Sequence, residues 1–123
     1  MNRTVLSATD FSADARQAAE RAALLCAAGA MAGSTLLHVM QACARARKRV
    51  VVLDRPNPLG GEAVEGNALD PEYRSFVGMH PLAVRHGMTS GELALMFREE
   101  LGLDVDLHVV PMKGWRRRMA YED

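Results

Sequence analysis

Two glutamates in the middle of the chain, Glu65 and Glu92, are of the residue type that general acid–base chemistry requires. Glu65 stands between Val64 and Gly66 in a predicted loop, where partial removal from water would favour the protonated acid form. Glu92 comes three residues after Thr89 at the start of a predicted helix, so a capping box is a second interpretation for its carboxylate. The pair therefore predicts acid–base chemistry or, for Glu92, a helix cap.

A third carboxylate, Asp54, comes directly after the apolar run Val50–Leu53 and is followed by Arg55. A short β-branched run bounded by turn residues indicates a strand buried on both faces, and open α/β sheets bind ligands at the carboxyl ends of such strands. The next loop combines prolines with glycines, so it is stiff in one half and permissive in the other. Two interpretations are open: a ligand site, or a tight exit in which Asp54 caps local N–H groups.

The elements that must position these residues alternate between strands and helices. The pattern predicts a strand over 4–8, a helix over 13–28, a helix over 34–48 capped by Ser34, a helix over 89–102 and a strand over 103–110, with breaks at Gly29 and Gly33. Within 34–48 a strand over 35–40 competes, and the lack of a turn residue after Met40 favours the helix. Residues 70–78 are predicted to be a turn followed by an extended segment. We expect an α/β fold with a short, largely parallel, Rossmann-like sheet covered by helices.

The composition narrows the classes of partner. The 123 residues are 49% hydrophobic, which predicts a single domain over 1–123. Fifteen basic and 15 acidic residues balance, so the charge gives no case for nucleic acid or an anionic membrane as partner. No apolar run is long enough to span a membrane and no signal peptide is recognisable, so we expect a cytoplasmic protein. Exposed sheet edges leave self-association open.

The cysteines and histidines give no metal-binding pattern. Cys26 and Cys43 both fall on apolar faces of predicted helices and have no CxxC or Cys/His spacing. We expect both thiols to be reduced and buried, and we expect neither a metal nor a cofactor.

Residues 5–12 have the sequence Val-Leu-Ser-Ala-Thr-Asp-Phe-Ser and precede an alanine-rich segment. Over residues 1–32 this unit resembles the first strand and helix of universal stress proteins, which implies a position near a nucleotide for Asp10. That family's glycine-rich phosphate-binding motif has no counterpart here, so ATP binding is not expected. A small nucleotide-binding or regulatory stress-type protein is the alternative function.

Six further motifs follow one another along the chain: VVLDRPNPLGG (51–61), VEG (64–66), SFVG (75–78), RHGMT (85–89), GELA (91–94) and PMKGWRR (111–117). Over residues 34–123 they resemble successive blocks of the exo-β-N-acetylmuramidase (NamZ) family. The resemblance implies part of a Rossmann-like catalytic domain of a peptidoglycan-recycling glycosidase. Such enzymes release N-acetylmuramic acid from the non-reducing end of glycan fragments. Together with residues 1–32, the chain looks like a composite, and an inactive truncated or composite product is a third alternative.

The resemblance implies a site for a muropeptide or amino sugar. Glu65 and Glu92 would be the catalytic carboxylates, because glycosidic hydrolysis needs a protonated carboxyl and a second carboxylate about 5 to 9.5 Å apart. The implied substrate-binding residues are Asp54, Arg55, Asn57, His86, Trp115 and Arg116. An arginine would pair with the lactyl carboxylate and the tryptophan would stack on a sugar face. We expect these side chains to converge where strand carboxyl ends and helix N-termini meet.

Overall fold

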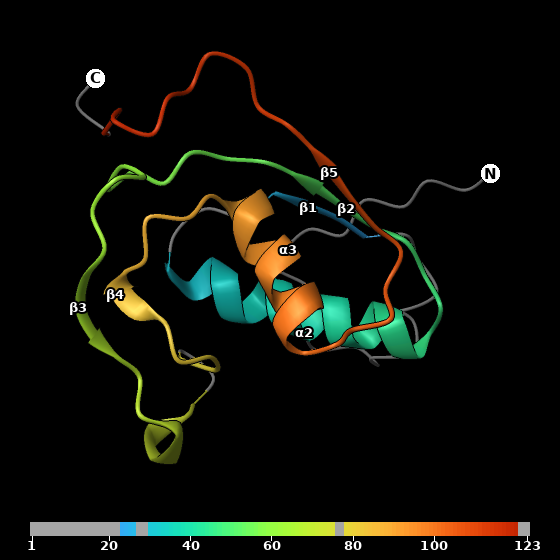
Figure 1. The fold of residues 1–123 in the computed structure, drawn as a ribbon. Helices are drawn as coiled ribbons and strands as arrows, with labels where there is room; N and C mark the ends of the chain where they lie inside the picture. The colour runs from blue at the N-terminus through green and yellow to red at the C-terminus, as the bar shows by residue number, and fades with distance from the viewer. Residues whose placement is uncertain (1–22, 27–29, 76–77, 121–123) are drawn as a thin grey trace.

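In the computed structural model, which describes residues 23–26, 30–75 and 78–120, the apolar run forms strand β2 (Val50–Leu53) (Figure 1). It is the middle strand of a three-stranded sheet in the order β1-β2-β5. Both neighbours, β1 (Ala23–Cys26) and β5 (Leu107–Val110), run parallel to it. The predicted strand is present, but only one of its faces is fully buried: Val50 and Val52 are 0% exposed, whereas Val51 and Leu53 on the opposite face are partly exposed.

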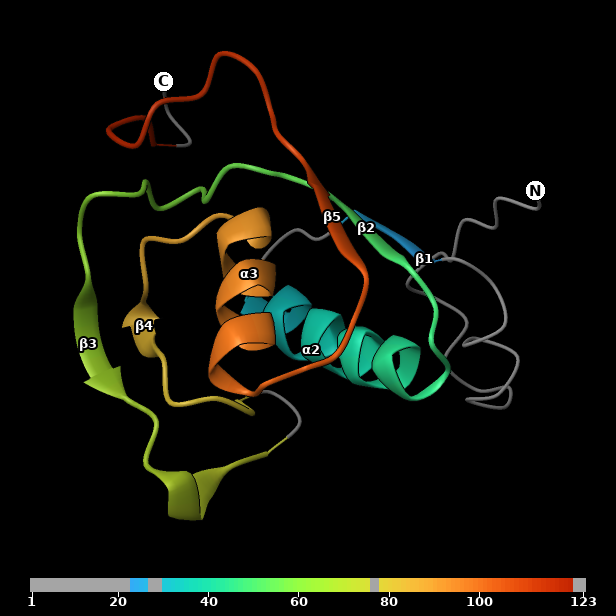
Figure 2. The same ribbon diagram turned by 45° about the vertical axis from the view of Figure 1, so that its right-hand side comes forward.

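Two helices cover the sheet on the same side (Figure 2). They are α2 (Ala30–Arg45) and α3 (Ser90–Glu100), which also contact each other. The core cluster joins both helices to β2 and the turn before β5: Leu36, Leu37, Met40, Cys43, Val50, Val52, Leu93, Ala94, Phe97 and Val105. The described residues therefore form a small α/β domain with a mostly parallel sheet, as the sequence predicts.

Helix α2 settles the competing interpretations of residues 34–48. The helix continues through Met40, so the strand over 35–40 is excluded. The predicted start is wrong, since the helix begins at Ala30 and includes both Gly33 and Ser34. The packing explains why the segment is a helix and not a strand, because Leu36, Met40 and the residues beside them form one buried face. Among the described residues, no helix is both long enough and apolar enough to cross a membrane.

Strand β1 contradicts the helix predicted over 13–28. Residues Ala23–Cys26 pair in parallel with β2, from Ala23 opposite Val50 to Cys26 opposite Leu53. An uninterrupted apolar run satisfies both a buried helix and a buried strand, and the open edge of β2 supplies backbone partners that favour the strand. Cys26 therefore lies on a strand and not on a helix. The strand predicted over 4–8 and the helical residues 13–22 lie outside the described residues.

Helix α3 follows its prediction closely. Thr89 caps α3, and Glu92 completes the predicted capping box. The helix ends with Gly102 in the left-handed conformation (φ +57°), as expected. The strand predicted over 103–110 is only half correct, because β5 begins at Leu107. Val105 instead turns back into the core through a bond from its N–H to the Leu103 carbonyl (2.9 Å).

A second, two-stranded sheet was not expected. β3 (Glu65–Ala68) pairs antiparallel with β4 (Ala83–Arg85), and the short 3-10 helix η1 (Pro71–Tyr73) lies between them. We call residues 65–85 the arm. All four residues of β3 are exposed, so its sequence carries no apolar alternation that could have revealed it. In Figure 1 the arm lies to the side of the helices, away from the parallel sheet.

Gly91 brings the N-terminus of α3 against the sheet, and this contact generates a test. A Cβ at Gly91 would lie 2.6 Å from Val109 Cγ1 and 3.0 Å from Asp54 Cγ. We expect Gly91→Ala to lower the free energy of unfolding by about 1–3 kcal/mol, because the added methyl overpacks this contact. Urea unfolding followed by the fluorescence of the single tryptophan measures it.

Gly33 provides the matched control, since it also lies in a helix but has no atom within 4 Å of an added Cβ. Gly33→Ala should raise the free energy of unfolding by up to about 1 kcal/mol, because alanine is the better helix former. Equal stability of the two variants would contradict the close seat of α3 on β5.

Candidate functional site

Asp54 joins the carboxyl end of β2 to the N-terminus of α3. Its N–H donates to the Val110 carbonyl (3.0 Å), which extends the pairing with β5. Its Oδ1 accepts from the N–H groups of Arg55 (3.0 Å) and Gly91 (2.7 Å). A carboxylate at a helix N-terminus is favourable because the first N–H groups have no partner within the helix. Capping, one of the two interpretations left open for Asp54, is therefore present.

Asn57 fastens the loop that follows, residues 54–61, which we call the β2 loop. Its Oδ1 accepts from the Leu59 N–H (3.0 Å) and its carbonyl from the Gly60 N–H (3.0 Å), which closes a tight turn. Its Nδ2 donates to the Met88 carbonyl (3.1 Å), just before α3. Two polar groups of Asn57 thus close the turn within the β2 loop, and its Nδ2 joins this loop to the segment before α3.

The C-terminal loop, residues 111–119, packs onto the β2 loop at Gly61. The Gly61 N–H donates to the Arg117 carbonyl (2.6 Å). A Cβ on Gly61 would lie 2.9 Å from the Trp115 ring and 3.2 Å from the Gly87 carbonyl oxygen. Gly87 is also constrained, with φ +67° and an added Cβ only 3.1 Å from the Gly61 oxygen. Three segments far apart in sequence therefore meet at two glycines.

Trp115 is half-buried against Gly61, and its indole Nε1 is buried without a hydrogen-bond partner. The two predicted substrate-binding arginines lie in the β2 loop and in the C-terminal loop. Arg55 follows Asp54 with an exposed side chain, and Arg116 is exposed in the C-terminal loop. The Arg116 N–H donates to Met119 Sδ (3.3 Å), and the residue is exposed.

Glu92 accepts hydrogen bonds on both carboxylate oxygens. Oε2 accepts from the Thr89 N–H (2.9 Å), and the Glu92 N–H donates to Thr89 Oγ1 (3.2 Å). Oε1 accepts from Nη2 of Arg117. Nη1 of Arg117 donates to the Gly61 and Gly87 carbonyls, both at 3.3 Å. The capping interpretation is correct for Glu92, and an arginine that was not predicted holds the remaining oxygen.

Glu65 lies on β3, and the expected removal from water is wrong: its side chain is 65% exposed. Its carboxylate pairs with Nη1 of Arg85 (2.8 Å), while Nη2 of Arg85 donates to the Leu59 carbonyl (2.5 Å). Glu65 and Glu92 are therefore linked to the same β2 loop, each through one arginine, at carbonyls two residues apart. Both glutamates lie around this loop.

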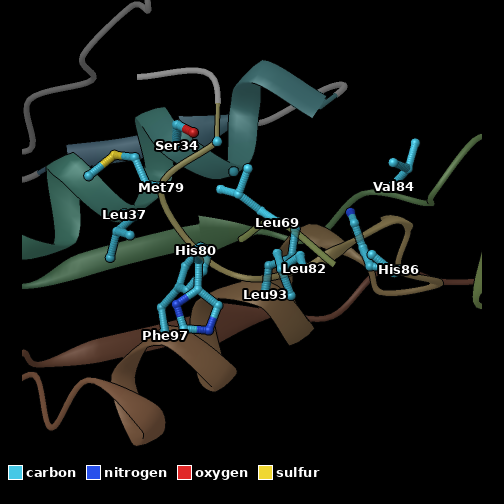
Figure 3. Close-up of a pocket in the computed structure, with 13 residues that line it drawn as sticks. Ser34, Leu37, Leu69, Met79, His80, Leu82, Val84, His86, Leu93 and Phe97 are labelled. Atoms are coloured by element: carbon cyan, nitrogen blue, oxygen red, sulfur yellow. The ribbon is translucent and has the colours of Figure 1, made fainter. Parts of the chain in front are cut away.

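His86 is half-buried, and burial lowers the pKa of its imidazole from the ordinary value of 6.5. Its Nδ1 accepts from the Met88 N–H (3.1 Å), so the neutral ring carries its proton on Nε2. The ring borders a cavity of about 240 Å³ between the helices and the arm (Figure 3). In the same cavity, His80 meets Phe97 edge to face at 5.5 Å and pairs with Glu100 at 2.7 Å.

That cavity is lined mainly by apolar side chains from α2, α3 and the arm, including Leu37, Leu69, Leu82, Leu93 and Phe97. Ser34, which is buried, adds a hydroxyl-bearing side chain to the lining of this cavity. On the described residues, no group of three or more His, Cys, Asp or Glu side chains has the geometry to hold a metal ion. Burial raises the pKa of the Cys43 thiol, which keeps it in the neutral form.

Sequence reasoning missed Arg117 and Arg85 as members of this arrangement. Arg117 belongs to the basic run 116–118, and nothing in the run distinguishes an arginine that bridges loops from one in solvent. Arg85 precedes His86 on a strand that was itself not predicted. Only the approach of the Leu59, Gly61 and Gly87 carbonyls reveals both roles.

The chain is similar to known proteins in sequence and in fold. Residues 33–123 match the family described as "Exo-beta-N-acetylmuramidase NamZ, N-terminal". The chain belongs to the NamZ family. Over 89 residues it is 49% identical to "Peptidoglycan beta-N-acetylmuramidase NamZ" of Bacillus subtilis (strain 168), an alignment that covers 72% of this chain and 22% of the relative. The NamZ resemblance of residues 34–123 is thus confirmed.

Two solved structures are similar to this NamZ family member. A DUF1343 family protein from Bacteroides fragilis NCTC 9343 has a TM-score of 0.76 at 40% identity and covers 82% of this chain and 28% of its own. A second DUF1343 family protein of that strain has a TM-score of 0.66 at 40% identity and covers 72% and 26%. The chain therefore spans between about a fifth and three tenths of these relatives. The stress-protein resemblance of residues 1–32 gains no support, and β1 replaces part of the helix that it requires.

The lowered pKa of His86 predicts a pH-dependent stability. Unfolding returns the ring to its ordinary pKa near 6.5, so the unfolded chain binds more protons than the folded chain below that pH. The free energy of unfolding contributed by His86 should be fully present above pH 6.5 and lost as the pH falls through the folded pKa. Urea unfolding at intervals from about pH 7.5 to 5 measures this slope.

His86→Gln isolates the contribution, because glutamine keeps an acceptor and a donor but does not titrate. The difference in slope between the parent chain and the variant should be confined to the window below pH 6.5. An NMR titration in which the His86 ring protonates at or above its ordinary pKa would refute the prediction.

Proposed function

We propose that this chain carries part of the sugar-binding and catalytic surface of a glycosidase that acts on peptidoglycan fragments containing N-acetylmuramic acid. The convergence of the β2 loop, residues 86–92 and the C-terminal loop at the carboxyl edge of the parallel sheet supports this proposal most strongly. The similarity to a relative named as a peptidoglycan beta-N-acetylmuramidase supports the substrate class.

Glu92 is proposed as the catalytic base or nucleophile. Both of its oxygens accept hydrogen bonds, from the Thr89 N–H and the Arg117 guanidinium, so the carboxyl group is held in one orientation. Its position on the first turn of α3 fixes the backbone beneath it. An ionised carboxylate held in one orientation is the group that attacks an anomeric carbon or activates a water there.

Glu65 is proposed as the acid that protonates the leaving oxygen. Glu65 lies on the exposed strand β3, and among the described residues its carboxylate pairs with Arg85, so a bound sugar can exchange this contact for one with the glycosidic oxygen. Burial under the sugar would then favour the protonated form. Glu65 and Glu92 approach the β2 loop through different arginines, which leaves the loop between them as the floor for the sugar ring.

The remaining predicted residues divide into contacts and supports. Arg55 and Arg116, both exposed, are proposed to bind the lactyl carboxylate that distinguishes muramic acid from glucosamine. Trp115 is proposed to stack on a sugar face, and the Nε2–H of His86 to donate to an acetamido or hydroxyl oxygen. Asp54 and Asn57 hold loops in the structure, so they are proposed to support the site without touching the sugar.

No observation favours the nucleotide-binding alternative or an inactive composite over this proposal. Among the described strands, β1 and β5 lie at the edges of the parallel sheet, and self-association through either edge stays a prediction. A cytoplasmic location and a single domain over 1–123 also stay predictions.

The acid and base assignments predict different losses on two substrates. Glu65→Gln should lower turnover of an N-acetylmuramyl disaccharide by about 100-fold or more, because an alkoxide leaves poorly without a proton. Its loss on a 4-nitrophenyl N-acetyl-β-muramide should be smaller, since nitrophenolate needs no acid, and binding should be spared. Glu92→Gln should abolish turnover of both substrates. Steady-state kinetics with calorimetric binding distinguishes these outcomes.

Glu62→Gln is the matched control, because Glu62 is an exposed glutamate just after the β2 loop. It should change neither turnover nor binding. Equal losses for Glu65→Gln on both substrates would contradict its role as the acid.

The proposed lactyl contact is tested by comparing two ligands. Arg116→Ala should weaken binding of N-acetylmuramic acid by about 10-fold or more, the effect of removing one charge-assisted hydrogen bond, and leave N-acetylglucosamine unchanged. Trp115 fluorescence titration reports both, and Arg98→Ala on the last turn of α3 serves as the control. If Arg116→Ala weakens both sugars equally, the lactyl assignment fails.

A further inference from the structure

Arg117 connects three segments of the chain through one guanidinium group. Nη1 donates to the carbonyls of Gly61 and Gly87, and Nη2 donates to the Glu92 carboxylate. The Arg117 carbonyl also accepts from the Gly61 N–H (2.6 Å), so backbone and side chain bind the β2 loop together. Arg117 thus takes part in four hydrogen bonds, which hold the C-terminal loop against the β2 loop, Gly87 and the first turn of α3.

The two carbonyls reach the same guanidinium nitrogen because both residues are glycines. An added Cβ on Gly87 would lie 3.1 Å from the Gly61 oxygen, and one on Gly61 would lie 3.2 Å from the Gly87 oxygen and from Arg117 Cγ. Side chains at either position would push the carbonyls apart. The glycine pair therefore creates a fixed acceptor for Nη1, and this acceptor orients Nη2 toward Glu92.

A simple surface ion pair would not have these features. Exposed pairs contribute little because both side chains remain mobile and screened by water. Here the Glu92 side chain is 34% exposed, its other oxygen is bound by the capping N–H, and the arginine is anchored by two backbone carbonyls. A lysine carries a single nitrogen, so it could not bind the two glycine carbonyls and the Glu92 carboxylate in the same way.

We propose that Arg117 is a positioning residue that fixes the Glu92 carboxylate for catalysis, so that docking of the C-terminal loop completes the site. This inference rests on the proposed function. It makes Trp115 and Glu92 interdependent, since the loop that carries the tryptophan also carries the arginine that orients the carboxylate. One loop then supplies both a sugar contact and the orientation of the catalytic carboxylate.

The test compares Arg117→Ala and Arg117→Lys with Arg118→Ala, which removes the exposed neighbouring arginine. We expect Arg117→Ala to lower kcat on the nitrophenyl muramide by about 10- to 100-fold and to leave KM within about 2-fold. Millimolar guanidinium ion should restore part of kcat in Arg117→Ala, because it can occupy the vacated acceptors. Arg117→Lys should lose activity without being rescued, and Arg118→Ala should match the parent chain.

An NMR measurement tests the same inference without turnover. The Thr89 amide donates to Glu92, so its resonance reports the orientation of the carboxylate. It should shift in Arg117→Ala and Arg117→Lys and stay unchanged in Arg118→Ala. An unmoved Thr89 amide, or a kcat loss that guanidinium does not rescue in a folded variant, overturns the inference. If the parent chain neither binds nor turns over the nitrophenyl muramide, the proposed function fails, and the Thr89 amide alone decides whether Arg117 positions Glu92.

Discussion

The bond from the Gly91 N–H to the Asp54 carboxylate fixes the relation between sheet and helix on which the site depends. β2 ends at Leu53, and this contact adds a directed bond to the apolar packing between its carboxyl end and the N-terminus of α3, which by itself has no direction. The carboxylate adds direction because it accepts two N–H groups at once. The missing side chain at Gly91 lets the backbones approach closely enough for the bond to form.

From this contact the loops are built outward by donors that reach backbone carbonyls. Asn57 reaches Met88, Arg85 reaches Leu59, and Arg117 reaches Gly61 and Gly87. Carbonyl acceptors of this kind are insensitive to pH, unlike carboxylates. Beyond Asp54, the β2 loop is therefore held through carbonyl acceptors that do not titrate, while Glu65 and Glu92 pair with the arginines that bind these carbonyls.

The sequence predicts the elements whose signals are local. Val50–Leu53 has four consecutive apolar residues, and Thr89 with Glu92 has a spacing that is readable without tertiary structure. The helix predicted over 13–28 was wrong at 23–26, because these residues pair with β2, which lies further along the chain. β3 was missed because all of its residues are exposed. The motifs contain most of the residues that meet around the β2 loop, but the contacts of Asp54, Asn57 and Arg117 depend on distances between loops that spacing does not encode.

The two glutamates differ in how much order the fold has already given them. Glu92 rests on a helix with three hydrogen bonds around it, so its conformational entropy is largely lost on folding. Glu65 lies on a strand with four exposed residues, in a sheet of only two strands, which is marginally stable alone. In the proposed function, a sugar that engages both carboxylates bridges the helical core and the arm, so the ligand itself would tie this two-stranded sheet to the first turn of α3.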